Sequence, residues 1–129
     1  MKTKWLSRYI AAPGPFLCIC TSEKEFKEAF KHIKVTPPEN WISSSHADAT
    51  VHTCDIEDNF AAIVCIRELT KETKRGIYGL IIHESVHIWQ KWCEYYGEHN
   101  PGDEQEAYAI QSLSQILMTE IDERLDKTP

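Results

Sequence analysis

The stretch that decides the fold is residues 73–97, T-K-R-G-I-Y-G-L-I-I-H-E-S-V-H-I-W-Q-K-W-C-E-Y-Y-G. Its apolar residues recur every three to four positions, which is the spacing of a helix with a buried face. We expect a helix from about Thr73 to Tyr96, closed by Gly97, because glycine is common directly after a helix end. Within this helix stands the run His83-Glu84-Ser85-Val86-His87.

This run has the form His-Glu-x-x-His, which is typical of zinc sites. Residues i and i+4 share one face of a helix, so the two imidazoles can point at one spot. On a helical wheel His83 and His87 share a polar strip with Gln90 and Glu94, on an otherwise apolar helix. Such a strip is costly to bury unless something satisfies the ring nitrogens. The run therefore predicts zinc ligands at His83 and His87, with Glu84 as a general base on metal-bound water.

A catalytic zinc takes three protein ligands and one water, so a third ligand is needed. Cys93 points to the wrong side of the helix, and His99 lies in the loop that follows. The next helix offers Glu104 and Glu106. Glu106 shares the direction of that helix's apolar side and forms a capping-box pattern with Asp103, whereas Glu104 faces the opposite way. We expect Glu104 as the third ligand, with Glu106 as the alternate.

The rest of the chain predicts a short sheet and two more helices. Alternating or continuous apolar runs favour three strands, at residues 16–20, 49–55 and 60–67. The second and third of these strands are expected to form a hairpin, in which the third strand is buried. Ser22 and Glu25 have the spacing of a capping box, which opens a helix to about Lys34. The last helix runs from Asp103 to about Leu125. The fold class predicted is α+β, with a short mixed or antiparallel sheet packed on three helices.

The bulk properties indicate one acidic domain, residues 1–129. A net charge of −6 gives no attraction to nucleic acid or to an anionic membrane, so neither is an expected partner. No apolar run approaches the roughly 20 residues of a membrane-spanning helix, and Arg8 and Pro13 interrupt what might otherwise resemble a signal peptide. Five cysteines cannot all pair, so buried reduced thiols and a cytoplasmic location are expected.

The chain resembles the gluzincins, in which a His-Glu-x-x-His helix is followed by a helix that carries a glutamate ligand. The run Glu104-Gln105-Glu106-Ala107-Tyr108 is similar to the Glu-x-x-Ala-(Asp/Asn) pattern of that second helix, which places Glu104 on the metal. Residues 83–90 and 104–111 also resemble minimal predicted metallopeptidases encoded by bacteriophages. The resemblance covers roughly residues 60–120 and implies work in the host cytoplasm if a phage encodes the chain.

The resemblance implies a small zincin-like domain that works as a zinc metallopeptidase on a protein or peptide substrate. An extended peptide would pair with a strand edge beside the metal helix, here the hairpin at 49–67. Gluzincins commonly carry Asp or Asn four residues after the ligand, where this chain has Tyr108. Tyr108 could contact a histidine or, like Tyr95, Tyr96 and His99, stabilise the oxyanion. The alternative function is a non-catalytic interaction protein, in which zinc joins two helices and the acidic surface binds a host or partner protein.

Overall fold

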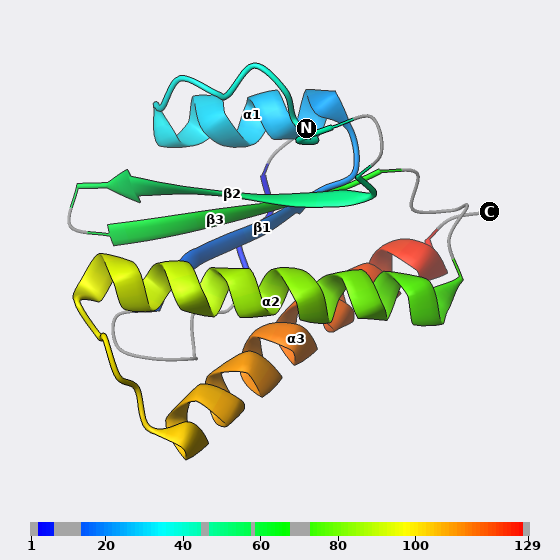
Figure 1. Cartoon of the computed structure of the whole chain (residues 1–129). Helices are drawn as coiled ribbons and strands as arrows, with labels where there is room; N and C mark the ends of the chain where they lie inside the picture. The colour runs from blue at the N-terminus through cyan, green and yellow to red at the C-terminus, as the bar shows by residue number, and fades with distance from the viewer. Residues whose placement is uncertain (1–2, 7–13, 45–46, 58, 68–72, 128–129) are drawn as a thin grey trace.

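The computed structural model describes residues 3–6, 14–44, 47–57, 59–67 and 73–127, which form three strands and three helices. The α+β class is confirmed: three helices pack on a short sheet, which is mixed (Figure 1). The elements follow the predicted order, and their bounds differ from the predicted ones by at most one residue at each end. They are β1 (Phe16–Cys20), α1 (Glu23–Ile33), β2 (Ala49–Ile56), β3 (Asn59–Ile66), α2 (Lys74–Tyr96) and α3 (Asp103–Asp126).

The sheet has the strand order β1-β3-β2, with β1 parallel and β2 antiparallel to β3. The central strand is β3, and its residues from Phe60 to Ile66 are all buried, as its continuous apolar run predicts. The edge strand β2 is only partly buried. The predicted hairpin is confirmed, because Val51 of β2 pairs with Val64 of β3 in an antiparallel register.

Each face of the sheet carries its own core, because side chains alternate along a strand. One face is covered by α1 and the other by α2 and α3 (Figure 1). Phe26 and Phe30 of α1 pack on the first face together with Cys18, Cys20 and Cys65. On the second face the central members are large side chains of α2 and α3, namely Ile81, Ile88, Trp89, Leu113 and Leu117. All five cysteines are free thiols, four of them buried.

Local hydrogen bonds explain where the helices begin and end. The Ser22 side chain accepts a hydrogen bond from the Glu25 amide, as predicted. In a capping box the Glu25 carboxylate would accept from the Ser22 amide, but here it accepts from the amide of the preceding residue, Thr21. Lys34 adopts a left-handed conformation and ends α1. Gly97 does the same for α2 with φ 73°, where glycine carries no steric penalty.

The capping box predicted for Asp103 and Glu106 is wrong. The cap of α3 is Gly102, which makes no side-chain capping bond. The Glu106 carboxylate instead accepts a hydrogen bond of 2.9 Å from the indole nitrogen of Trp89 on α2. A buried indole N–H needs an acceptor, and that need takes precedence over a solvent-accessible helix end.

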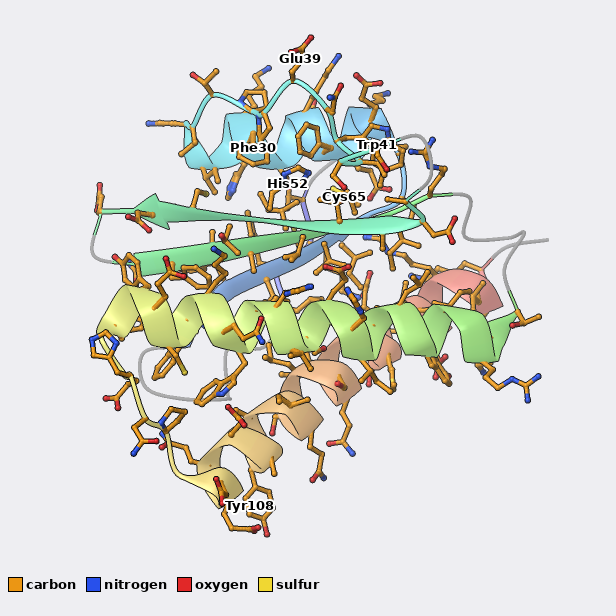
Figure 2. The ribbon with its side chains drawn as sticks, viewed as in Figure 1. Phe30, Glu39, Trp41, His52, Cys65 and Tyr108 are labelled. Atoms are coloured by element: carbon orange, nitrogen blue, oxygen red, sulfur yellow. The ribbon has the colours of Figure 1, made fainter. Side chains whose placement is uncertain are left out.

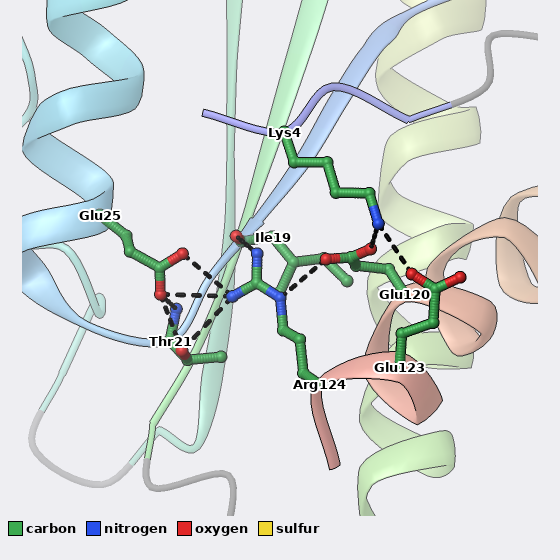
Figure 3. A network of polar contacts seen from close by, with 7 residues as sticks. All are labelled: Lys4, Ile19, Thr21, Glu25, Glu120, Glu123 and Arg124. Atoms are coloured by element: carbon green, nitrogen blue, oxygen red, sulfur yellow. Dashed lines mark hydrogen bonds and ion pairs between the residues drawn. The ribbon is translucent and has the colours of Figure 1, made fainter. Parts of the chain in front are cut away.

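A polar network around Arg124 of α3 ties both layers to the sheet (Figure 3). Its guanidinium donates to the Ile19 carbonyl oxygen of β1 at 2.9 Å. It also pairs with Glu25 of α1 at 3.0 Å and with Glu120 of α3 at 2.9 Å. Lys4 approaches the other oxygen of Glu120 at 2.6 Å, which fastens the N-terminal segment to α3. Among the described helices, none is long and apolar enough to cross a membrane.

Replacing Arg124 by Met should lower the free energy of unfolding by about 2–4 kcal/mol, because the largely buried carboxylates of Glu25 and Glu120 both lose the guanidinium between them. Urea unfolding followed by circular dichroism measures this. Arg75→Met, at an exposed position of α2, is the control and should cost less than about 0.5 kcal/mol. Equal losses in the two variants would contradict the role assigned to the network.

Acid should weaken the same network. Burial alone would raise the pKa of Glu120, but hydrogen bonds from Lys4 and Arg124 outweigh it and hold the pKa below its ordinary value. A carboxyl with a lowered folded pKa adds stability above the unfolded pKa of about 4.3, and this stability is lost as the pH falls through the folded value. Thermal unfolding between pH 6 and 3 should therefore show a shallower acid loss for Glu120→Gln than for the wild type. If the melting temperatures of the two proteins fall in parallel as the pH is lowered, the stabilising role of ionised Glu120 is contradicted.

Candidate metal centre and cleft

The helix α2 presents its two histidines and its glutamate in different environments. It buries one side against the sheet, because Ile77, Ile81 and Ile88 are fully covered. His83 and His87 lie about one helical turn apart on the opposite, exposed side. Glu84 lies between these two sides and is buried, with only 5% of its surface exposed. The order of residues in this run therefore places the two imidazoles on the exposed surface of the helix and the carboxylate of Glu84 toward the interior.

The two imidazoles are spaced as ligands of one metal ion. Their Nε2 atoms are 3.2 Å apart and the rings are inclined by 76°. Tetrahedral zinc with Zn–N bonds of 2.0–2.1 Å separates two ligand nitrogens by about 3.3 Å, so the pair fits this ion. The Gln90 side-chain oxygen lies 3.2 Å from Nδ1 of His87. A proton on Nδ1 donated to that oxygen leaves the Nε2 lone pair of His87 for a metal.

The carboxylate of Glu84 is held against the edge strand β2. The backbone of Val51 forms a hydrogen bond with it. Burial raises the pKa of the Glu84 carboxyl above its ordinary value, and the opposing effects of His83, His87 and the Val51 bond offset only part of this. A raised pKa moves a carboxyl toward the range in which it can both accept and return a proton.

His83, Glu84 and His87 all line one pocket of about 350 Å³. Its opposite wall is the edge strand β2, where the sequence places the predicted hairpin edge. The described residues that line it come from the segment before β2, from β2 and from α2; they are Ser43, Ala49, Thr50, Val51, Thr53, His83, Glu84, His87 and Lys91. A cleft thus opens beside the two histidines.

The structure does not bring Glu104 or Glu106 to the histidines. Among the described residues, no three metal-ligating side chains form a group that could hold a metal ion. The reason lies in the packing: Trp89, which bonds Glu106, follows His87 by two positions and points to the far side of α2. Glu104 is exposed in the first turn of α3. The two predicted histidine ligands, His83 and His87, therefore lie next to each other. The third zinc ligand, Glu104 or Glu106, stays a prediction.

The four residues considered as oxyanion donors are also dispersed. Tyr108 is 63% exposed and points away from the sheet and α2 (Figure 2), so it does not contact a histidine. Tyr95 packs on Phe60, and Tyr96 packs on Trp92. None of these tyrosines, nor His99, is among the described residues that line the pocket.

Sequence reasoning placed the hairpin edge beside the histidines but missed two features of the pocket, the bond from Val51 to Glu84 and the charge of Lys91. Val51 reads as an ordinary strand residue, and only the packing of α2 on β2 reveals its bond to Glu84. Lys91 follows His87 by four positions, a spacing that could have indicated its place beside the histidines.

Comparisons with family models, with curated proteins and with solved structures found no match.

Zinc titration by calorimetry tests the histidine pair. The wild-type chain should bind one zinc ion, and His83→Ala or His87→Ala should weaken binding on the order of 100-fold, because each removes one ligand. His99→Ala, on the exposed loop after α2, is the matched control and should leave the affinity unchanged. Equal affinities of all four proteins would exclude a metal at this pair.

The same titration decides the third ligand. The sequence pattern predicts that Glu104→Ala weakens zinc binding by about tenfold or more, because it removes the third ligand, whereas Glu106→Ala should stay within about threefold of the wild type. Affinities within about threefold in both variants would mean that neither carboxylate joins the histidines, in line with the packing of α3 in the structure.

Proposed function

We propose that the chain is a zinc-dependent hydrolase that cleaves a peptide bond in an extended protein segment. One observation carries this proposal: the two histidines and the intervening glutamate line one cleft with an edge strand as its opposite wall. The gluzincin-like pattern of the sequence leads to the same chemistry. The free thiols and acidic charge suit a reducing cytoplasm, that of the host if a phage encodes the chain.

The edge strand is where we place the substrate. Among the described strands β2 pairs with β3 alone, and residues of β2 such as Val51 line the cleft. A peptide added to such an edge gains main-chain hydrogen bonds, while its side chains fill neighbouring pockets. Bound this way, the peptide would run past Val51 and bring one of its carbonyl groups close to Glu84 and the histidines.

The chemistry divides between the metal and the chain. Zinc held by His83 and His87 would supply a water of lowered pKa. Glu84 is set to accept a proton from the attacking water on its carboxylate and to return that proton to the departing amine. The bond from Val51 orients the carboxylate, and burial keeps bulk water from it. We propose no oxyanion donor, because none of the four candidates lies in the cleft.

The alternative function differs from the hydrolase in what it requires of the cleft. Both functions take a third zinc ligand from α3, and among the described residues no carboxylate of α3 lies beside the histidines. The two helices are joined instead by apolar packing and by hydrogen bonds such as Trp89 to Glu106. A metal-stabilised binding protein would also have no need of a buried glutamate in an open cleft.

The variant Glu84→Gln tests the hydrolase. Fluorescence-quenched peptide mixtures incubated with the zinc-loaded chain should be cleaved, and Glu84→Gln should lower kcat by about 10²–10⁴-fold, because an amide cannot accept the proton. Zinc affinity and thermal stability should stay close to those of the wild type.

Glu98→Gln is the control, since Glu98 is exposed on the loop after α2 and outside the described cleft lining. Chelation should abolish cleavage, and added zinc should restore it. Full activity of Glu84→Gln would remove the general-base role. No cleavage of any peptide by the zinc-loaded wild type would contradict the hydrolase itself.

A further inference from the structure

The cleft contains a cation that the proposed reaction does not use. Lys91 of α2 lines the pocket and is 54% exposed. It forms an ion pair with Glu94, whose carboxylate lies 3.5 Å away and whose side chain is 74% exposed. A pair this open to water is weak, so the ammonium can exchange Glu94 for a ligand in the cleft at little cost.

The other charged and titratable groups of the cleft do not neutralise Lys91. Of the described residues that line it, Glu84 is the one carboxylate, and it is engaged with the backbone of Val51. His83 and His87 are the remaining titratable groups, and both are assigned to the metal. Among the described residues that line the cleft, Lys91 is thus the one side chain with a fixed positive charge, although the net charge of the chain is −6. Because the whole chain repels anions at a distance, an anionic group is favoured only where it contacts Lys91.

The spacing along α2 tells which part of a bound peptide meets Lys91. Four helical residues from His87 to Lys91 span about 6 Å along the axis. Two residues of an extended chain span about 6.6 Å, and residues two apart point to the same side. A peptide whose scissile bond lies beside the histidines therefore presents the side chain two residues away to Lys91.

The direction of the peptide follows from the sheet. The strand β2 and the helix α2 run in the same sense (Figure 1). A peptide that pairs antiparallel with β2, the more stable arrangement, runs opposite to α2 and passes Lys91 before it reaches the histidines. Its residue beside Lys91 is therefore on the N-terminal side of the scissile bond.

We infer that the cleft selects segments with Asp or Glu two residues before the cleaved bond, and that Lys91 determines this specificity. The inference rests on the proposed function, since it takes the peptide to lie along β2. A carboxylate at Lys91 forms a charge-assisted hydrogen bond, which an amide of the same shape does not match.

Binding to the metal-free chain tests the recognition without requiring cleavage. Fluorescein-labelled extended octapeptides that carry Glu, Gln or Lys at one position are titrated and followed by anisotropy. The Glu peptide should bind about five- to tenfold more tightly than the Gln peptide, and added salt should reduce the difference. Lys91→Glu should reverse the order and favour the Lys peptide, a gain that a misfolded variant cannot produce.

Lys24→Glu on α1 is the matched control, because it is exposed and makes the same change in net charge. It should keep the preference for the Glu peptide. Equal binding of the three peptides by the wild type, or an unchanged preference in Lys91→Glu, would overturn the inference.

Cleavage by the zinc-loaded chain separates the two proposals. The products of a peptide mixture should show Asp or Glu two residues before the cut, with kcat/KM about five- to tenfold above the Gln analogue and no such preference in Lys91→Met. Cleavage without this preference would overturn the role of Lys91 and leave the hydrolase standing. A binding preference without any cleavage would support Lys91 and contradict the hydrolase.

Discussion

The arrangement of the cleft depends on the burial of one side of α2 against the central strand β3. Ile77, Ile81 and Ile88 on this side are fully covered, and β3 is itself buried along its length. This contact fixes the rotation of the helix about its axis. Once the rotation is fixed, Glu84 must point toward the edge strand and the two histidines must lie at the rim, because their angular positions follow from the helical repeat. A rotation of one residue, about 100°, would bury an imidazole in the core and expose the carboxylate.

The third helix stabilises this orientation from behind. Trp89 reaches α3 and donates its indole proton to Glu106, while Tyr78 near the start of α2 donates to Asp122 near the end of α3. These two bonds lie far apart along the helices and define the crossing of α2 over α3. The Arg124 network then connects α3 to β1 and α1. The cleft is therefore held by elements that do not themselves line it.

Much of the fold is predictable from local patterns, whereas the completed site is not. The apolar runs of the strands, the spacing within α2 and the glycine at position 97 each predict an element, because each reflects a preference of a few neighbouring residues. His83 and His87 are one turn apart in any helix, so their proximity follows from the sequence alone. The position of Glu104 depends instead on how two helices cross, and the wheel of one helix carries no information on that angle. Glu106 illustrates the difference: its local pattern predicts a helix cap, but the buried indole of Trp89 takes the carboxylate.

The position of β2 at the edge of the sheet also exposes the chain to association with itself. An edge strand with unpaired main-chain groups can accept the edge of another copy and extend into a larger sheet. Two features oppose this. The edge lies in a cleft with α2 as one wall, which limits the approach of a second folded domain. In addition, each copy carries a net charge of −6, so two copies repel each other at low ionic strength, whereas a short unfolded segment can still enter.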